Sequence, residues 1–156
     1  MRVHIAADHA GFEVREALIA QLSTGGYEVV DHGAFVYDAL DAYPPMCIAC
    51  GEAVVADLEA GTPALGLVIG GSGNGEQMAA NLVDGVRAAL IWNESTAQLA
   101  RLHNNANVGA IGARQHTVED AVALAETFLA TPFSEDERHI DRIRMMTEFE
   151  QARCAE

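Results

Sequence analysis

Short aliphatic segments alternate with amphipathic segments along this chain, and that alternation limits the folds available to it. Five segments have the length and composition of buried strands, and they cover residues 3–7, 28–31, 64–69, 88–91 and 108–111. Helices are predicted between and after these strands, over residues 12–23, 45–60, 94–104, 117–129 and 135–153. Strands that alternate with helices form a mostly parallel sheet that is covered on both faces.

We therefore expect an α/β fold, in the form of one three-layer, Rossmann-like domain over residues 1–156. It would contain a mostly parallel five-stranded sheet and a C-terminal helix. A chain of 156 residues is long enough to bury a sizeable core in one domain. Because ligands bind beyond the carboxyl ends of the strands in such sheets, the residues just after each strand are expected to carry the chemistry.

Several helix boundaries follow from capping residues. Asn93 and Thr117 precede predicted helices and are expected to act as N-caps. Ser134 is expected to cap the last helix, with Glu137 completing a capping box. Pro45 suits the first turn of the second helix, so residues 32–44 are expected to form a loop.

The charge of the chain excludes several classes of function. The formal net charge is −14, and all nine cationic side chains are arginines. Such a surface repels nucleic acid and anionic membranes, so neither is an expected partner. Without lysine the chain has no Schiff-base chemistry, and a bound phosphate would be held by arginine and backbone. No apolar run approaches the roughly 20 residues of a spanning helix. The first residues begin a strand and not a secretory signal, so we expect a cytoplasmic location.

Cys47 and Cys50 form a C-x-x-C pair, which in other contexts marks a redox or zinc site. Here the pair lies inside a predicted helix, and no second pair of ligands accompanies it. At a spacing of three residues both thiols face the same way, so core-facing positions are the favoured interpretation. A thiol redox protein is the competing hypothesis.

The richest motif is the segment from Gly70 to Glu76, which follows the buried run ending at Ile69 and precedes a predicted helix. Glycines let a backbone approach a ligand and direct its N–H groups toward an anion. The spacing matches neither a dinucleotide-binding loop nor a Walker loop. A carboxylate, Glu76, stands beside this anion-binding loop, which is the arrangement that proton abstraction from carbon requires. A tight strand-to-helix connection without a ligand is the other interpretation.

Two more strand ends carry polar residues. Asp8 and His9 follow the first strand, and Arg114 follows the fifth. By the rule for parallel sheets these groups and the glycine loop can converge. Asp8 also suits a capping role, and Arg114 a surface ion pair. His103 lies at the end of the predicted helix between the fourth and fifth strands, so it would approach from a helix end or from a neighbouring subunit.

The last predicted helix places Arg138 and Arg142 four residues apart on one face. Like charges at this spacing repel one another, but a pair of arginines suits an anion such as phosphate. Local pairing of Arg138 with Glu135 or Asp141 is the alternative. His139 lies about 100° from either arginine around the helix, and the sequence assigns it no role.

Taken in order, these motifs resemble the ribose-5-phosphate isomerase B family, which includes the galactose-6-phosphate isomerase subunits. The resemblance covers nearly the whole chain. It rests on Asp8-His9-Ala10-Gly11, Asp31-His32-Gly33, Tyr43-Pro44, the glycine loop with Ala79-Ala80-Asn81, His103-Asn104-Asn105-Ala106-Asn107, Gly112-Ala113-Arg114, and Arg138 with Arg142.

The sequence departs from the family pattern at one important position. Many members place a catalytic cysteine just before the Gly-Thr/Ser-Gly of the loop, where this chain has Gly70. The chain instead resembles the branch in which a glutamate, here Glu76, takes the proton. Ala42 also stands where an acidic residue is common.

The resemblance implies the interconversion of ribose 5-phosphate and ribulose 5-phosphate through a cis-enediolate. It implies Glu76 as the base and His103, assisted by Asp8, as the group that opens the sugar ring. The oxyanion would be held by Ser72 and by the N–H groups of the loop. The implied substrate-binding residues are Asp8, His9, Gly71, Ser72, Gly73, Asn74, Gly75, Asn104, Arg114, Arg138 and Arg142.

The family resemblance also implies that no metal or organic cofactor is needed and that the site forms between the subunits of a homodimer or a higher homo-oligomer. Two other functions stay open. A hexose 6-phosphate such as allose or galactose 6-phosphate would need a longer pocket. A non-catalytic sugar-phosphate sensor would need the arginines but neither Glu76 nor His103.

Overall fold

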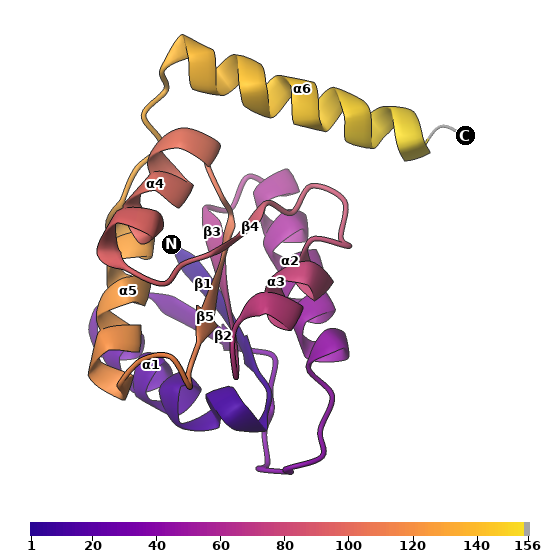
Figure 1. Ribbon diagram of the computed structural model, residues 1–156. Coiled ribbons are helices and arrows are strands. Elements are labelled where there is room, and N and C mark those ends of the chain that lie inside the picture. Colours follow the sequence, from indigo (N-terminus) through magenta and orange to yellow (C-terminus); the bar gives the residue numbers. More distant parts are fainter. Residues whose placement is uncertain (155–156) are drawn as a thin grey trace.

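A five-stranded sheet runs through the centre of the molecule, with helices on both faces (Figure 1). The computed structural model describes residues 1–154, so the last two residues of the predicted domain lie outside the described part. The strands are β1 (Arg2–Ala7), β2 (Glu28–Asp31), β3 (Ala64–Gly70), β4 (Ala88–Leu90) and β5 (Val108–Gly112). Their order is β2-β1-β3-β5-β4, and every neighbouring pair is parallel. The predicted α/β architecture is confirmed.

Three long helices cover one face of the sheet and two cover the other. In Figure 1, α1 (Phe12–Thr24), α4 (Glu94–Asn104) and α5 (Val118–Ala130) lie on the left. On the right lie α2 (Tyr43–Glu59) and the short α3 (Asn74–Ala80). A 3₁₀ turn, η1 (His9–Gly11), joins β1 to α1, and α6 (Glu137–Cys154) crosses the top of the view.

The alternation of side chains along each strand divides the core between the two faces. Leu67 and Ile69 of β3 pack toward Phe128 of α5, all three being fully buried. Val68, between them, packs on the other face with Cys47 and Cys50 of α2. Both cysteines are buried and free, as the helical spacing predicted. Burial raises the pKa of the Cys50 thiol to about 12 and also raises the pKa of the Cys47 thiol, which leaves both protonated and unreactive.

The predicted caps are correct for two helices and wrong for one. Asn93 accepts from the Thr96 N–H, and Thr117 accepts from the Asp120 N–H. By contrast, α6 begins at Glu137, two residues later than expected. Glu135 has a left-handed φ of 58°, so residues 134–136 are not helical.

No capping box forms at the start of α6, because the Ser134 hydroxyl has other partners. It lies 2.9 Å from His139 Nδ1 and accepts a longer hydrogen bond, 3.3 Å, from the Asp136 N–H. At the other corrected boundary, α2 begins at Tyr43, so Pro44 and Pro45 both lie in its first turn. The predicted loop is correspondingly shorter. Proline suits these positions because the first helical N–H groups have no partner within the helix.

Asp31 of the motif Asp31-His32-Gly33 has a structural role. Its carboxylate accepts two hydrogen bonds from the buried Arg15 of α1, at 2.8 and 2.6 Å, and a third from the Gly33 N–H. The paired arginine holds the pKa of Asp31 below its usual value despite partial burial. This bidentate pair fastens α1 to the end of β2.

The C-terminal helix lies beyond the sheet, beside α4 (Figure 1). The Ser134 N–H donates to the Leu102 carbonyl, and the rings of His139 and His103 are 4.2 Å apart between centroids. Further along α6, large apolar side chains are exposed, among them Met145 at 59% and Phe149 at 69%. None of the helices in the described part of the chain has the length and apolar character needed to cross a membrane.

Candidate active site

A cavity of about 510 Å³, which we call the carboxyl-edge cavity, opens at the carboxyl ends of β1, β3 and β5. The register explains why these ends meet, since Ala7 pairs with Ile69 and Gly70 pairs with Gly112 across neighbouring strands. The structure thus brings together the three strand-end groups that the sequence singled out. The cavity is lined by Asp8, His9, Ala10, Tyr43, Gly71, Ser72, Gly75, Glu76, Arg114 and Gln115.

The glycine loop presents free backbone N–H groups to this cavity. Within the described residues, the N–H groups of Gly71 and Ser72 have no hydrogen-bond acceptor. Gly73 has a φ of 79°, and a side chain there would meet the backbone of Ile111 and Gly112. The Ser72 hydroxyl accepts from the Asn74 N–H and side-chain amide, at 3.3 and 3.2 Å. The loop can therefore stabilise an anion with preoriented dipoles.

Glu76 lies in the first turn of α3 and is 4% exposed. Burial raises the pKa of its carboxyl group, and the negative charge of Asp8 raises it further. The backbone N–H groups of Glu76 and Gly73 act in the opposite direction, but burial outweighs them. Removal from water makes the carboxylate a stronger base than an ordinary glutamate. The sequence alone could not decide between these two opposing effects.

Asp8 has the capping role and also faces the cavity. Its Oδ1 accepts from the N–H groups of Ala10 and Gly11, at 2.9 and 3.2 Å, which fixes the turn after β1. The residue is 7% exposed and contributes to the cavity wall. Its two roles therefore coexist, because the cap uses one carboxylate oxygen.

Asp41 is a site residue that the sequence reasoning missed. Its Oδ1 lies 2.7 Å from His9 Nδ1 and 3.1 Å from the His9 backbone nitrogen. The residue belongs to a loop without periodicity, so no local pattern connected it with a histidine 32 positions earlier. Asp8, His9 and Asp41 offer ligand atoms within 4.8 Å of one another. The hydrogen bond already pairs two of them, and we assign no ion to the group.

Tyr43, which the sequence presents only within the motif Tyr43-Pro44, lies in the cavity wall. Its ring lies against Gly75, where a β-carbon would come 2.6 Å from the phenol oxygen. The glycine therefore lets the first turn of α2 approach the first turn of α3. The earlier start of α2 is what carries this tyrosine into the site.

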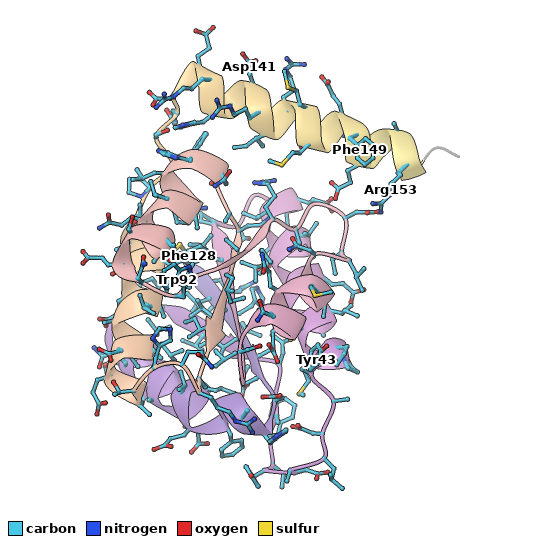
Figure 2. All side chains as sticks on the ribbon, in the orientation of Figure 1. Tyr43, Trp92, Phe128, Asp141, Phe149 and Arg153 are labelled. Atoms are coloured by element: carbon cyan, nitrogen blue, oxygen red, sulfur yellow. The ribbon has the colours of Figure 1, made fainter. Side chains whose placement is uncertain are left out.

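Glu76 lies near the carboxyl ends of the strands, whereas His103 and Asn104 lie at the opposite edge of the sheet, formed by the amino ends of the strands. They end α4, and β5 starts at Val108, so they precede the strand whose far end borders the glycine loop. The four steps from Val108 to Gly112, at about 3.3 Å each, separate the two edges by roughly 13 Å. In Figure 2, Tyr43 lies in the lower half of the molecule, and α6 crosses the top.

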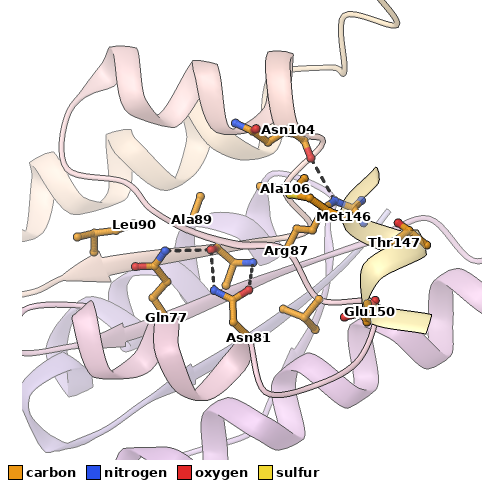
Figure 3. A pocket seen from close by; sticks show the side chains of 12 residues that line it. Gln77, Asn81, Arg87, Ala89, Leu90, Asn104, Ala106, Met146, Thr147 and Glu150 are labelled. Carbon is orange, nitrogen blue, oxygen red and sulfur yellow. Dashed lines mark hydrogen bonds between the residues drawn. The ribbon is translucent and has the colours of Figure 1, made fainter. Parts of the chain in front are cut away.

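Asn104 borders a different pocket, of about 470 Å³, beneath α6 (Figure 3). The Arg87 guanidinium crosses this pocket and donates to the Asn104 carbonyl at 3.1 Å, so the Asn104 backbone is fixed. Met146 and Glu150 of α6 line the other side. None of the residues that line the carboxyl-edge cavity borders this pocket.

Arg138 and Arg142 accompany His103 at this second edge. Both are exposed, and Arg138 makes a long ion pair of 3.8 Å with Asp136. Its partner is neither Glu135 nor Asp141, the two carboxylates of the alternative interpretation. Arg142 has no carboxylate partner among the described residues. One chain therefore holds two partial sites: the residues of the carboxyl-edge cavity, and a second group consisting of His103, Asn104, Arg138 and Arg142.

Comparisons with known proteins agree with this architecture. Residues 3–146 match the model of the Ribose/Galactose Isomerase family. The ribose-5-phosphate isomerase B of Mycolicibacterium paratuberculosis is 50% identical over 155 residues, covering 99% of this chain and 95% of that protein. The protein of the same name from Mycobacterium tuberculosis is 50% identical over 150 residues, covering 96% and 90%.

A solved structure gives a matching result. Ribose-5-phosphate isomerase B from Mycoplasma genitalium with bound ribulose 5-phosphate superposes with a TM-score of 0.89 at 35% identity, covering 96% of both chains. The family model spans most of the chain, and the relatives match it nearly end to end. The chain therefore belongs to the Ribose/Galactose Isomerase family.

Proposed function

We propose that this protein is an aldose–ketose isomerase that interconverts D-ribose 5-phosphate and D-ribulose 5-phosphate. The observation that carries the proposal is the buried Glu76 carboxylate, with its raised pKa, beside the unpaired N–H groups of Gly71 and Ser72. A base next to an anion-stabilising loop fits proton transfer between adjacent carbons. Two similar mycobacterial proteins are named ribose-5-phosphate isomerase B, and this supports the same reaction for the present chain.

The chemistry proceeds in two stages. The furanose ring first opens, with His103 donating a proton to the ring oxygen and Asp8 assisting at the anomeric hydroxyl. Glu76 then removes the proton from C2, which leaves a cis-enediolate whose negative charge the loop N–H groups and Ser72 stabilise. Glu76 returns the proton to C1, and the hydroxyl proton on O2 passes to O1, which leaves a ketone at C2. A single carboxylate serves both carbons because C1 and C2 are adjacent.

We further propose that a complete site forms between two copies of the chain, in at least a homodimer. The roughly 13 Å between the sheet edges is too far for one sugar ring to contact both Glu76 and His103 of the same chain. A partner could place its His103 and Asn104 over the carboxyl-edge cavity.

The exposed apolar side chains of α6 support an interface at this helix. Met145 and Phe149 are more than half exposed, and removing such apolar surface from water favours association. A helix that carries both these residues and the predicted phosphate ligands would bring the ligands to the partner when the apolar residues dock.

The phosphate group is assigned to three arginines. Arg114 borders the cavity beside Gly71, while Arg138 and Arg142 would come from the second copy. His9 and Asn104 complete the proposed contacts, together with the backbone of Gly73, Asn74 and Gly75. Binding the phosphate positions the distant C1–C2 bond over Glu76, so its binding energy contributes to catalysis. The predicted cytoplasmic location stays part of this proposal.

The decisive experiment measures deuterium exchange from solvent into C2 of ribose 5-phosphate. Wild-type protein should exchange this position, and Glu76→Gln should slow exchange by roughly 10²–10⁴-fold, the usual contribution of a positioned base. Glu52→Gln, which changes an exposed carboxylate on α2, is the matched control and should exchange normally. Normal exchange by Glu76→Gln would contradict the assignment of the base.

The same assay separates the competing functions. Faster turnover of a hexose 6-phosphate than of ribose 5-phosphate would favour a hexose phosphate isomerase. Tight binding of ribose 5-phosphate by wild-type protein without any exchange would identify a sugar-phosphate sensor.

A further inference from the structure

Asp41 holds the imidazole of His9 in one orientation at the wall of the carboxyl-edge cavity. A single oxygen, Oδ1, bonds both the ring nitrogen Nδ1 at 2.7 Å and the backbone N–H at 3.1 Å. His9 borders the cavity. Because Asp41 occupies Nδ1, Nε2 is the ring nitrogen that remains for a molecule in the cavity.

The chemistry of the pair selects a tautomer. An ionised carboxylate only accepts hydrogen bonds, so the hydrogen between the two side chains must belong to His9 Nδ1. A neutral imidazole with hydrogen on Nδ1 carries a lone pair on Nε2. In the neutral ring, the contact with Asp41 therefore leaves Nε2 as a hydrogen-bond acceptor.

The surroundings of His9 leave Nε2 available. Asp8 Oδ2 lies 4.0 Å from Nδ1, the nitrogen that Asp41 already occupies. The Tyr37 ring contacts the imidazole edge-on, with 6.3 Å between the ring centroids. Within the described part of the chain, no side chain forms a hydrogen bond with Nε2. Glu76 and Arg114 line other parts of the cavity.

The second oxygen of Asp41 is unfavourable for stability. Oδ2 is buried and has no hydrogen-bond partner among the described residues. A buried polar atom left unpaired destabilises a protein. An asparagine could satisfy the His9 backbone N–H equally well, but its amide could also donate to Nδ1. A carboxylate, by contrast, only accepts a hydrogen bond there.

We infer that Asp41 is a positioning residue of the isomerase, which holds His9 as the Nδ1–H tautomer so that Nε2 accepts a hydrogen bond from a hydroxyl group of the sugar. This inference rests on the function proposed above. Asp41 touches no substrate and acts through His9. Its role resembles that of a carboxylate that orients a histidine in other enzymes.

The test compares Asp41→Asn with Asp38→Asn. Asp38 lies in the same loop and only caps the Leu40 N–H, so its substitution removes the same charge without touching His9. We expect Asp41→Asn to lower kcat/KM by roughly 10- to 100-fold, the range for losing a hydrogen bond to a charged group. Its thermal midpoint should be unchanged or higher, and Asp38→Asn should retain wild-type activity.

A double-mutant cycle with His9→Asn shows whether Asp41 acts through the ring. In the His9→Asn background, Asp41→Asn should produce almost no further loss. Full additivity of the two losses would overturn the inference. If His9→Asn alone retains full activity, the proposed substrate contact of His9 fails, while the Glu76 exchange experiment still tests the isomerase independently.

The tautomer can be read in the unsubstituted protein by ¹⁵N NMR of the His9 ring, which does not depend on any variant folding. We expect the Nδ1–H form to predominate at neutral pH and the Nε2–H fraction to rise in Asp41→Asn. A predominant Nε2–H tautomer in the wild-type protein would overturn the inference.

Discussion

The α-carbon of Gly70 lies directly against the carboxyl group of Glu76. A β-carbon built on Gly70 would overlap Glu76 Oε1 and the carboxyl carbon. Any side chain at position 70 therefore excludes the present position of the Glu76 carboxylate. In the cysteine branch of the family, residue 70 would carry the thiol, so the two kinds of base compete for the same space.

Gly70→Ala tests this relationship. The overlap involves the far end of a flexible side chain, so the protein should fold, but the carboxylate must move. We expect kcat to fall by at least about 100-fold, since a displacement of about 1 Å can have that effect. Thermal unfolding and steady-state kinetics measure the two consequences.

Gly25→Ala is the control for this variant, because a β-carbon there makes only ordinary contacts at 3.4 Å or more, remote from the cavity. It should leave kcat unchanged. Wild-type kcat in Gly70→Ala would show that the observed Glu76 position is not required for catalysis.

The pH profile should report the environment of Glu76. The base is active when ionised, and burial together with Asp8 raises its pKa above the ordinary value of 4.5. Activity should therefore be lost, as pH falls, at a higher pH than for an ordinary glutamate. Asp8→Asn removes a negative charge beside Glu76, so it should move the acid limb of the kcat/KM profile to lower pH. It should also lower the maximum value of kcat/KM, because Asp8 assists ring opening. An unmoved limb would mean that another group titrates there.

Mixing two inactive variants tests the proposed site between subunits. Glu76→Gln and His103→Gln each disable both sites of a homodimer. A heterodimer would contain one site with both substitutions and one with neither. Half of the randomly formed dimers are heterodimers, so subunit exchange should restore about a quarter of wild-type activity. No recovery, with exchange of subunits verified by mass spectrometry, would place the site within one chain.

The arginines of α6 offer a matched pair. Arg142 has no carboxylate partner in the described part of the chain, while Arg144 pairs with Asp141 and Glu148 at 3.4 and 2.6 Å. Arg142→Ala should lower kcat/KM for ribose 5-phosphate by roughly 10- to 100-fold, because charged hydrogen bonds to phosphate are lost. Arg144→Ala should change it less than about threefold. Equal effects would remove the phosphate role of Arg142.

The apolar face of α6 should control association. Met145 and Phe149 are exposed in the isolated chain, so replacing both with aspartate should not disturb its own core. Burying two carboxylates at an interface is strongly unfavourable. We expect the double variant to sediment as a monomer at micromolar concentration and to lose isomerase activity. A stable, active dimer would show that the interface lies elsewhere.

The sequence alone determined the succession of elements and the chemistry at the carboxyl edge. Hydrophobic patterning identified all five strands, including β2 and β4, which are only partly buried. Strand polarity then placed Asp8, the glycine loop and Arg114 at one edge. The boundary errors arose where local signals compete. Ser134 is a good cap by its chemistry, but the buried His139 takes its hydroxyl.

Only the tertiary structure decided which groups share a cavity. Spacing along the chain did not reveal that His103 and the α6 arginines lie at the edge opposite Glu76, because that depends on how α4 returns across the sheet. The contact of Asp41 with His9 joins two loops without periodicity. The contact of Gly70 with Glu76 depends on the angle between β3 and α3. Contacts between distant segments depend on packing, which no local pattern in a single sequence encodes.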